Sequence, residues 1–494
     1  MGLWEYNYFI KFLEVVMINL KKGLVPFWDY YLIDPRHTNA ILSANKPQKR
    51  DTVMVFDKPW EGNATNYFTI IKDGGLYRMY YEVWGLNDKP LNIMVCYAES
   101  RDGLHWEKPE LGIVEYNGNK KNNIIIGKIP DNFTVMKDEN PDCPPEMKYK
   151  ALGSVLEIDY IDGNKRNMLA LWVSSDGIHF NRHSIISRGY AYDTQNSLHW
   201  NRHTGKYYCY IRDYHKVDDD PQSRFEESNV RANMVLESED LTNWSEAQYL
   251  NYNGECYPLY TNCVTAYPYD DRYYVGFPSR YVQRRRWTKN YDRLGGAEKR
   301  KKRMEIEPRL GLAVTDCVFM SSRDNVNWYR FDEAIVTPGI EDGENWIYGD
   351  CYPALGGLIE TPSPFRNCPP ELSLFMGNHR WMDSPVELVR YVYRRDGMAS
   401  LKAPYEEKKL LTKAFTFEGS TLRLNFSTSA RGCIYLRILD EYNVPIKGYS
   451  TCEIFGDSVD RILDFDKPLS ELSGKAVKFE FTMSDAEIFS MTFE

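Results

Sequence analysis

Ser100-Arg101-Asp102-Gly103-Leu104-His105-Trp106 is one copy of a motif that recurs along the chain. Ser174–Phe180 has the same form, Ser-x-Asp-Gly-x-x-aromatic, while Ser238–Trp244 and Ser322–Trp328 keep the Ser, the Asp and the Trp. Arg395-Asp396-Gly397 is a worn fifth copy. The Asp residues of successive copies stand 74, 64, 84 and 72 positions apart. Self-similarity at a period of roughly seventy residues indicates a repeat architecture.

Each copy has the composition of a turn between two strands. The Asp side chain accepts hydrogen bonds from backbone N–H groups two or three residues on, Gly supplies a positive φ, and the aromatic residue packs at the start of the next strand. The segments before the first copy, 77–84 and 92–98, are rich in β-branched and aromatic residues, as strands are. We therefore expect Asp102, Asp176, Asp240 and Asp324 to be structural turn residues at the periphery.

Five units, each suited to a four-stranded sheet, predict a five-bladed β-propeller over residues 48–404. Residues 1–47 are expected to be a lead-in segment, and the strand that starts at Asp51 is expected to open blade one. Residues 405–494 hold short alternating strands, such as 422–426 and 434–439, and predict a C-terminal antiparallel β-sandwich. The predicted fold class is thus all-β, a five-bladed β-propeller followed by a β-sandwich.

Composition limits the classes of partner. The chain has 494 residues and a net charge of −9, which argues against nucleic-acid binding. Its ten cysteines show no CxxC pair or metal-finger spacing, which predicts free thiols in a reducing compartment and no metal or other cofactor. No segment approaches the roughly 20 apolar residues of a membrane span, and residues 1–23 lack the features of a signal peptide. We expect a cytoplasmic protein without a membrane partner; whether it is a homo-oligomer is left open.

A basic segment after Arg280 contains Arg284-Arg285-Arg286 and, further on, residues 299–303. On an acidic protein such a run is most often a solvated loop. A polyanion site or a subunit contact is the alternative.

The starts of the inner strands of a propeller meet at one end of the central channel, so polar residues there face one another across blades. Glycoside hydrolysis needs two carboxyl groups in such a place, one that protonates the leaving oxygen and one that attacks or activates water. The candidate catalytic residues are Asp57 and Glu61 in blade one, Asp193 in blade three, Asp316 in blade four and Asp350 in blade five. Asp316 interrupts the apolar run 312–318, where a buried carboxylate is costly unless it is paired.

Aromatic and polar residues near the same strand starts are candidates for substrate binding: Trp60, Gln195, Asn196, Arg280, Trp346, Tyr348, His379 and Arg380. Trp60, Trp346 and Trp381 would stack on sugar rings, and Gln195 and Asn196 would bind hydroxyl groups. The structural alternative is that they are core plugs and turn residues. Arg280, His379 and Arg380 would supply the anion pocket that a phosphorylase needs.

Three stretches carry a resemblance to a known group. Tyr97–Gly112, Glu307–Cys317 and Trp346–Pro353 resemble bacterial proteins related to the invertase/inulinase and arabinanase glycosidases. The resemblance covers about residues 27–494. It implies a five-bladed propeller whose axial site holds a nucleophile or base Asp, a charge-stabilising Asp and an acid Glu.

Individual motifs of that group are matched only in part. The invertase motif Trp-Met-Asn-Asp-Pro-Asn-Gly is absent, and Asp57–Gly62 stands in its region. The Arg-Asp-Pro motif is matched as Arg212-Asp213-Tyr214 and the Glu-Cys motif as Glu255-Cys256. Asp213 and Glu255 are therefore the alternative catalytic residues.

The leading hypothesis is a retaining or inverting glycosidase that acts on oligo- or polysaccharides. The alternatives are a glycosyltransferase, phosphorylase or lyase on the same propeller, and a noncatalytic sugar-binding propeller. Carboxyl separations distinguish them, because about 5–5.5 Å favours retention and about 6.5–9.5 Å favours inversion, whereas a longer separation favours binding alone.

Overall fold

The computed structural model describes residues 17–85, 91–129, 131–158, 163–216, 223, 225 and 229–494. Residues 1–16, and with them the expectation about a signal peptide, lie outside the described residues. The chain divides into two compact units, Ala44–Met398 and the N-terminal residues up to Ser43 together with Ala399–Glu494. These boundaries lie a few residues from the expected 48 and 404.

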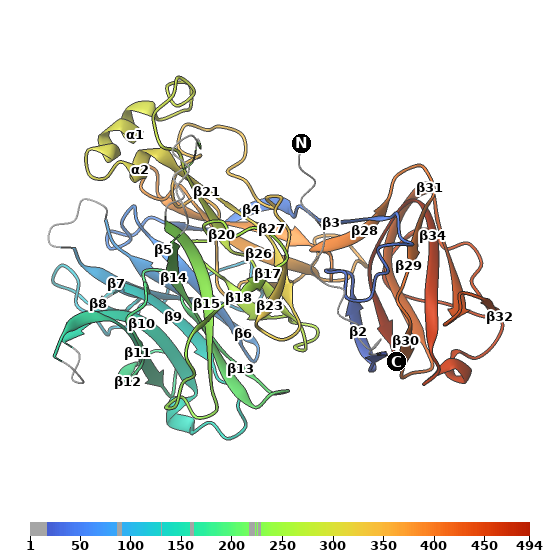
Figure 1. Cartoon of the computed structure of the whole chain (residues 1–494). Coiled ribbons are helices and arrows are strands. Elements are labelled where there is room, and N and C mark those ends of the chain that lie inside the picture. The colour runs from blue at the N-terminus through green and yellow to red at the C-terminus, as the bar shows by residue number, and fades with distance from the viewer. Residues whose placement is uncertain are drawn as a thin grey trace. The chain divides into compact units, whose positions relative to one another are not determined.

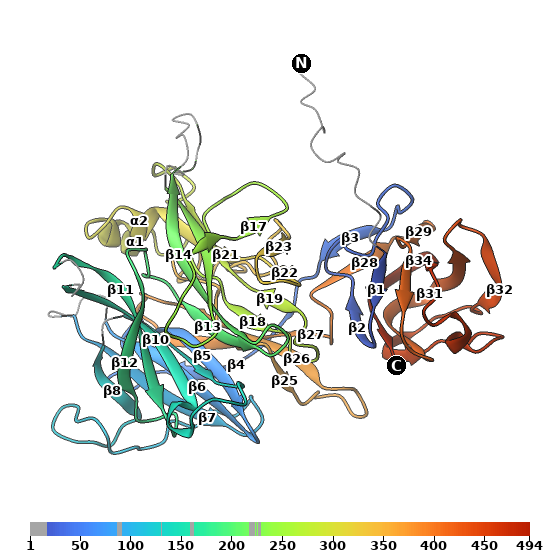
Figure 2. The same cartoon turned by 60° about the horizontal axis from the view of Figure 1, so that its bottom comes forward.

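The first unit contains five blade sheets and the two-stranded sheet β20–β21, and Figure 1 shows its strands gathered apart from those of the second unit's sheet. Blade one consists of β5 (Asn66–Asp73), β6 (Leu76–Val83), β7 (Ile93–Ser100) and β8 (Ile124–Ile129), and blade two of β9 (Asp131–Lys137), β10 (Tyr149–Ile158), β11 (Lys165–Ser174) and β12 (Asn181–Arg188). Blade three consists of β13 (Ser197–Asn201), β14 (Lys206–Lys216), β15 (Asn229–Ser238) and β16 (Gln248–Tyr249). Figure 2 shows β10, β11 and β12 as adjacent strands of blade two.

Blade four consists of β18 (Val264–Ala266), β19 (Tyr274–Gly276), β22 (Met320–Ser322), β23 (Asn327–Arg330) and β17 (Asn251–Tyr252). Blade five consists of β24 (Tyr352–Pro353), β25 (Ile359–Thr361), β26 (Glu371–Asn378), β27 (Val386–Tyr393) and β4 (Gln48–Phe56). The inner strands contact one another around the ring: β5 touches β9, β9 touches β13, β13 touches β18, and β24 touches β5. The prediction of a five-bladed propeller is confirmed.

The strand β4 occupies a different blade from the one expected. It does not open blade one but is the outermost strand of blade five, where Met54 pairs with Leu388 and Phe56 with Val386. Blade one begins instead at Asn66. The N-terminal end of the propeller sequence thus closes the ring, and hydrogen bonds tie it to the last blade.

The repeated motif connects the third strand to the fourth in blades one to four. Asp102 Oδ1 accepts from the N–H groups of Leu104 at 2.8 Å and His105 at 2.9 Å. Asp176, Asp240 and Asp324 bond the backbone of their own turns in the same way at 2.7–3.0 Å. The position after the Asp has positive φ even where Leu241 or Asn325 replaces Gly. The structural role predicted for the four Asp residues is confirmed.

These turns also join neighbouring blades. Tyr80 Oη, from the second strand of blade one, donates to Gly177 O in the turn of blade two at 2.9 Å. Tyr210 Oη, from the second strand of blade three, donates to Asn325 O in the turn of blade four at 3.1 Å. In the fifth copy Asp396 accepts from the hydroxyl of Tyr267 in blade four.

An insertion between β19 and β22 contains β20 (Ser279–Gln283), α1 (Ala297–Met304), α2 (Arg309–Leu312) and β21 (Ala313–Cys317). The expectation that the basic segment is a solvated loop is wrong for Arg300 and Arg303, since both side chains of α1 are buried. Arg300 donates to Asn345 O and Trp346 O, each at 2.7 Å. The helix therefore supports a loop of blade five.

The second unit is one hydrogen-bonded sheet of ten strands. Its members are β1 (Ile18–Leu20), β2 (Gly23–Pro26), β3 (Ile41–Ala44), β28 (Ala399–Ala403), β29 (Lys408–Leu411), β30 (Phe415–Phe417), β31 (Leu422–Asp440), β32 (Pro445–Ser450), β33 (Asp457–Ile462) and β34 (Val477–Phe493). Residues 18–44, expected to be a lead-in, thus contribute three strands. Alternate residues such as Leu422, Leu424 and Phe426 are buried in a single apolar core. The β-sandwich itself stays a prediction.

Helical structure is otherwise sparse in the described residues, with 3₁₀ turns at Pro145–Met147 and Leu469–Leu472. No helix among them is both long and apolar enough to cross a membrane. All ten cysteines are free thiols.

Candidate active site

Aromatic side chains from three blades gather where the inner strands begin. Tyr67 of β5, Tyr260, Tyr348, Tyr352 of β24 and Trp381 belong to one buried cluster, here called the axial aromatic cluster. The rings of Tyr260 and Tyr352 stack with centroids 5.6 Å apart, and those of Tyr348 and Trp381 lie 4.9 Å apart. One end of the channel is therefore walled by flat apolar surfaces.

Three carboxyl groups lie at the same end. Glu82 closes β6, where it pairs with Asn66 at the start of β5, and it is completely buried. Asp131 is the first residue of β9 and is half-buried, and Asp193 is exposed just before β13. Glu82 Oε1 accepts from the N–H of Phe133 at 2.6 Å. The carboxyl groups of Glu82 and Asp131 act directly on each other's pKa, and a hydrogen bond between them requires a proton on one of the two. Glu82 Oε2 is buried and has no other hydrogen-bond partner among the described residues.

Burial and neighbouring charge decide where that proton resides. Burial raises the pKa of Glu82 well above its usual range, and the Asp131 charge raises it further. Burial, followed by the Asp193 charge, raises the pKa of Asp131 to about 6. Of the two groups, the fully buried Glu82 is therefore the one that holds a proton more tightly, and a protonated Glu82 can donate to the Asp131 carboxylate.

Two buried arginines approach the axial aromatic cluster. The guanidinium of Arg212 on β14 is 0% exposed and lies 4.7 Å from the Tyr260 ring centroid. Arg380 is 5% exposed and lies 4.3 Å from the Trp381 ring. Arg380 Nη2 donates to the side-chain oxygen of Asn66 at 2.9 Å. Its charge opposes the burial effect by lowering the pKa of Glu82 and of Asp131.

Of the five carboxylates predicted to be catalytic, Asp193 is the one whose charge is among the main causes of the raised pKa of Asp131. Asp57 is exposed at the end of β4, in blade five rather than blade one. Glu61 is buried and fully partnered, because it accepts from Lys58 N at 3.0 Å, Tyr81 Oη at 2.7 Å and Lys108 Nζ at 2.6 Å. These contacts hold the loop before blade one in place.

Asp316 and Asp350 have other surroundings. Asp316 forms a bidentate ion pair with Arg280 across the β20–β21 pair, at 2.9 and 2.6 Å. Asp350 Oδ2 accepts from Ile347 N at 3.0 Å, and its Oδ1 has no partner among the described residues. Burial raises the pKa of Asp350 to about 7. Neither carboxyl is among the main charges that act on Glu82 and Asp131.

The candidate binding residues divide into two groups. Tyr348 and Arg380 lie at the axial aromatic cluster. The side chains of the other residues are engaged with the protein itself: Gln195 donates to Phe68 O at 2.7 Å, Asn196 to Tyr192 O at 3.0 Å, Trp60 to Asn123 Oδ1 at 2.9 Å and Trp346 to Gly339 O at 2.8 Å, Arg280 pairs with Asp316, and His379 Nε2 lies 3.2 Å from Asp342.

The residues of the partial invertase motifs are also separated. Arg212 reaches the axial aromatic cluster, whereas Asp213 follows it in β14 and so projects from the opposite face of the blade. Glu255 is exposed in a loop, and its backbone oxygen accepts from Arg330.

Glu82 and Asp131 were not among the residues selected from the sequence. Glu82 interrupts the apolar and aromatic run from Met79 to Val83, which is the kind of signal that singled out Asp316. Asp131 directly precedes the strand-like run 132–136. Its importance follows only when β9 is known to be an inner strand.

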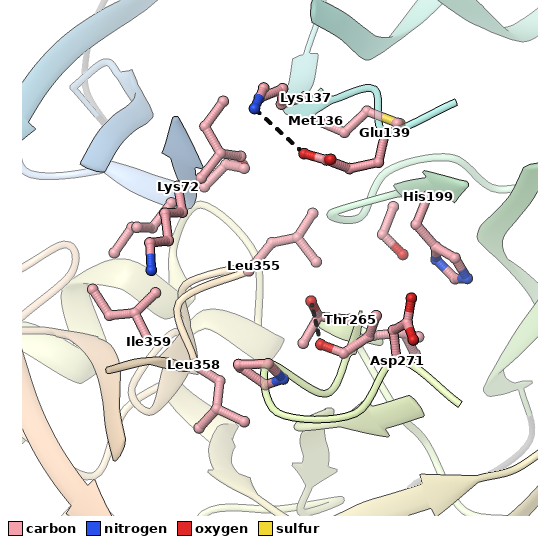
Figure 3. A pocket seen from close by; sticks show the side chains of 18 of the residues that line it. Lys72, Met136, Lys137, Glu139, His199, Thr265, Asp271, Leu355, Leu358 and Ile359 are labelled. Carbon is pink, nitrogen blue, oxygen red and sulfur yellow. Dashed lines mark hydrogen bonds and ion pairs between the residues drawn. The ribbon is translucent and has the colours of Figure 1, made fainter. Parts of the chain in front are cut away.

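The other end of the channel holds a cavity of about 480 Å³. Lys72 of β5, Lys137 of β9 and Ile359 of β25 line it with His199 and Thr265 (Figure 3). Lys137 Nζ lies 3.4 Å from Glu139 there. The cavity adjoins the ends of the inner strands, whereas the three carboxyl groups adjoin their starts. Within the described ranges, no group of three or more His, Cys, Asp or Glu side chains is placed to hold a metal ion.

Comparisons with known proteins give limited overlap in sequence. No family model matches the chain. Two uncharacterized proteins of Mycobacterium tuberculosis, MT1551 of strain CDC 1551 / Oshkosh and Rv1502 of strain H37Rv, are each 39% identical to it over 58 residues. The match covers 11% of this chain and 19% of each relative, so the chain spans about a fifth of the length of these relatives.

Similar solved structures include several named as glycoside hydrolases. A thermostable family-43 glycoside hydrolase gives a TM-score of 0.42 at 15% identity, over 74% of this chain and 96% of that one. An N-acetylgalactosamine deacetylase from F. plautii in complex with blood group B trisaccharide gives 0.41 at 12%, over 75% and 96%. A sucrose-6-phosphate hydrolase from Lactobacillus gasseri gives 0.36 at 12%, over 94% and 93%. At these values the reaction has to be argued from the site.

Proposed function

We propose that the protein is a glycoside hydrolase whose reaction takes place at Glu82, Asp131 and Asp193. The observation that carries the proposal is a carboxyl pair that retains a proton, beside an exposed Asp, at the aromatic end of a propeller channel. Glycosidases need one carboxyl group that is protonated near the working pH and a second that is not. The resemblance of the sequence to invertase- and arabinanase-like glycosidases supports the same class of reaction.

The surroundings of each carboxyl suggest its role. Asp131 is half-buried and has a pKa of about 6, which suits a group that protonates the glycosidic oxygen. Asp193 is exposed and would attack the anomeric carbon or activate a water molecule. Glu82 is completely buried and would be a positioning residue, since it holds the β9 backbone through Phe133 N and raises or lowers the readiness of the neighbouring Asp131 to give up its proton. The axial aromatic cluster would stack on the sugar.

Hydrolysis of aryl glycosides and oligosaccharides by single variants tests the proposal. Asp131→Asn and Asp193→Asn are each expected to lose at least about 10²-fold in kcat/KM on sugar leaving groups. Dinitrophenyl glycosides need no proton on the leaving oxygen, so they should restore Asp131→Asn but not Asp193→Asn. Asp176→Asn, in the repeat turn of the blade that carries Asp131, is the matched control and should keep wild-type activity. Full activity in both site variants, or no cleavage by the wild type across the panel, would contradict the proposal.

A further inference from the structure

Three arginines surround the axial aromatic cluster, and two of them share one face of blade three. In the β14–β15 pair Arg212 lies opposite Asn233, and Tyr214 lies opposite Arg231. Strands β14 and β15 run side by side (Figure 1). From the register of this pair, Arg212 and Arg231 are diagonal neighbours on the same side of the two strands. Both guanidinium carbons lie within 5.5 Å of the ring centroids of Tyr214 and Tyr260.

Each of these arginines has a buried N–H group without a hydrogen-bond partner in the described ranges. Nε and Nη1 of Arg212, Nε of Arg231 and Nε of Arg380 are buried and have no hydrogen-bond partner among the described residues. Within the same part of the chain, none of the three arginines forms an ion pair. A guanidinium carries five N–H donors, and leaving buried donors unpaired is costly.

Stacking on tyrosine does not account for this arrangement. A tyrosine ring stabilises the face of a guanidinium through the cation–π interaction. The N–H donors lie in the plane of the guanidinium and point away from that face. The structural role of the stacked arginines therefore leaves the donors of Arg212 available to a ligand.

The charges at the site are also unequal. Arg212, Arg231 and Arg380 bring three guanidinium groups to the site, whereas the carboxyl groups there that are not completely buried number two, those of Asp131 and Asp193. A fourth cation, Arg309, lies over Tyr348 but is already paired with Glu307 at 2.6 Å. A neutral sugar would leave the surplus positive charge unmatched.

We propose that the candidate active site binds an anionic oxygen group through Arg212 and Arg231, with Arg380 as the third cation. The inference rests on the proposed function and names its substrate class, an acidic sugar whose carboxylate is held by the guanidinium groups. The planar fork of a guanidinium matches a carboxylate in bidentate geometry. Inorganic phosphate, the co-substrate of phosphorolysis, offers the same chemistry and is separated from the acidic sugar by the test.

Calorimetric titration of the intact protein with matched sugars tests the proposal. Glucuronate and galacturonate are compared with glucose and galactose, and inorganic phosphate is titrated separately. Each acidic sugar is expected to bind at least about tenfold more tightly than its neutral counterpart, with an affinity that falls as salt is added. Arg212→Gln should abolish this preference, and Arg212→Lys should restore part of it because the charge returns without the fork.

Arg390→Gln provides the matched control, since Arg390 is also buried but is paired with Asp51 and Glu371 in blade five. It should keep the preference for acidic sugars. Arg231→Gln is the second test variant. Arg231 is only half-buried, so its substitution should destabilise the fold less than the substitution of Arg212 does. It should weaken acidic-sugar binding while its thermal unfolding stays near that of the wild type.

Each outcome bears on the proposal. Binding of phosphate but not of acidic sugars, lost in Arg212→Gln, supports the anion site with phosphate as its ligand, and phosphate-dependent release of a sugar phosphate should then follow. Equal affinity for acidic and neutral sugars without phosphate binding, or no binding of any probe, overturns it. Hydrolysis of neutral glycosides that Arg212→Gln leaves unchanged would also overturn the anion site while the hydrolase stands. Acidic-sugar binding without cleavage of any glycoside, glucuronides included, would remove the hydrolase and keep the anion site.

Discussion

The carboxyl groups of Glu82 and Asp131 meet between neighbouring blades and act on each other's pKa, although the two residues lie near the end of one strand and at the start of another. A carboxylate has no hydrogen to donate, so this contact exists only while one partner is protonated. The fully buried Glu82 holds the proton more tightly than Asp131 does, because ionising Glu82 would place a second negative charge beside Asp131 in a dry site. The pair thus prepares Asp131 for proton transfer.

Glu82→Gln should be nearly silent. The amide of Gln can donate an N–H to Asp131, and its oxygen can accept from Phe133 N, as the protonated carboxyl of Glu82 does. We expect kcat/KM within about threefold of the wild type at pH 6, because the hydrogen bond to Asp131 persists. Glu82→Leu removes the donor, so the pKa of Asp131 rises and the basic limb of the pH–rate profile moves to higher pH. Inactivation by Glu82→Gln as complete as that by Asp131→Asn would show that Glu82 itself transfers the proton.

The pH dependence of hydrolysis should follow Asp131. As the proton donor it must be protonated, so kcat/KM is expected to fall about tenfold per pH unit above its pKa of about 6. Asp193→Asn removes a negative charge that raises the pKa of Asp131. The residual kcat/KM of this variant should therefore begin to fall at a lower pH than that of the wild type. Rates that rise rather than fall through pH 6 would assign Asp131 the role of base.

The blade count could be predicted from the sequence because the motif that reveals it is stabilised locally. Asp102 and its three counterparts bond N–H groups two and three residues away, so the pattern reports the turn directly. The place of β4 depends instead on pairing with β27 more than 300 residues away. Its alternation of apolar and polar residues suits an outer strand of any blade, and the sequence pattern therefore led to the wrong one.

The site was harder to predict for the same reason. A charged side chain within an apolar strand is expected either to have a partner or to take part in the chemistry of a site. Asp316 and Glu82 both occupy such positions. Whether such a residue is structural or belongs to the site depends on its partner, and the spacing of the sequence does not reveal that partner. Arg280 neutralises Asp316 across the β20–β21 pair, whereas Glu82 meets Asp131 of the next blade. Asp193 was found because it precedes an inner strand, but the role of Asp131 in an inner strand depends on the blade boundaries.

Asp102→Ala should cost stability without affecting the site. Losing the two backbone hydrogen bonds of the turn is comparable to losing a helix cap, about 1 kcal/mol. Denaturant unfolding at pH 7 measures the loss, and kcat/KM should be unchanged. Asp102→Asn is the control, since its side-chain oxygen can still accept both bonds. A loss of activity in the Ala variant at full folding would contradict the peripheral role of the turn.

Arg300→Met tests whether α1 supports the blade-five loop. The change leaves the carbonyl oxygens of Asn345 and Trp346 buried without donors, which we expect to cost about 2–4 kcal/mol. Unfolding by denaturant and the rate of proteolysis between residues 338 and 350 report the effect. Lys302→Met, at an exposed position of the same helix, should change neither. Equal effects of the two variants would show that α1 is a surface appendage.

Asp350→Asn should stabilise the protein at alkaline pH. Burial raises the pKa of Asp350 to about 7 from an ordinary value of 3.8, against the opposing effects of Ile347 N and the His379 charge. Between about pH 4 and 7 the unfolded chain loses this proton while the folded chain keeps it, so the free energy of unfolding falls as the pH rises and then stays level. Asn cannot ionise, so the variant should match the wild type near pH 4 and exceed it by about 2–4 kcal/mol at pH 8. Thermal unfolding at the two pH values measures the difference, and glycoside hydrolysis by the same samples separates stability from catalysis. A variant that gains no stability at pH 8 yet loses hydrolysis would show that ionised Asp350 is used by the reaction, as the sequence alone suggested.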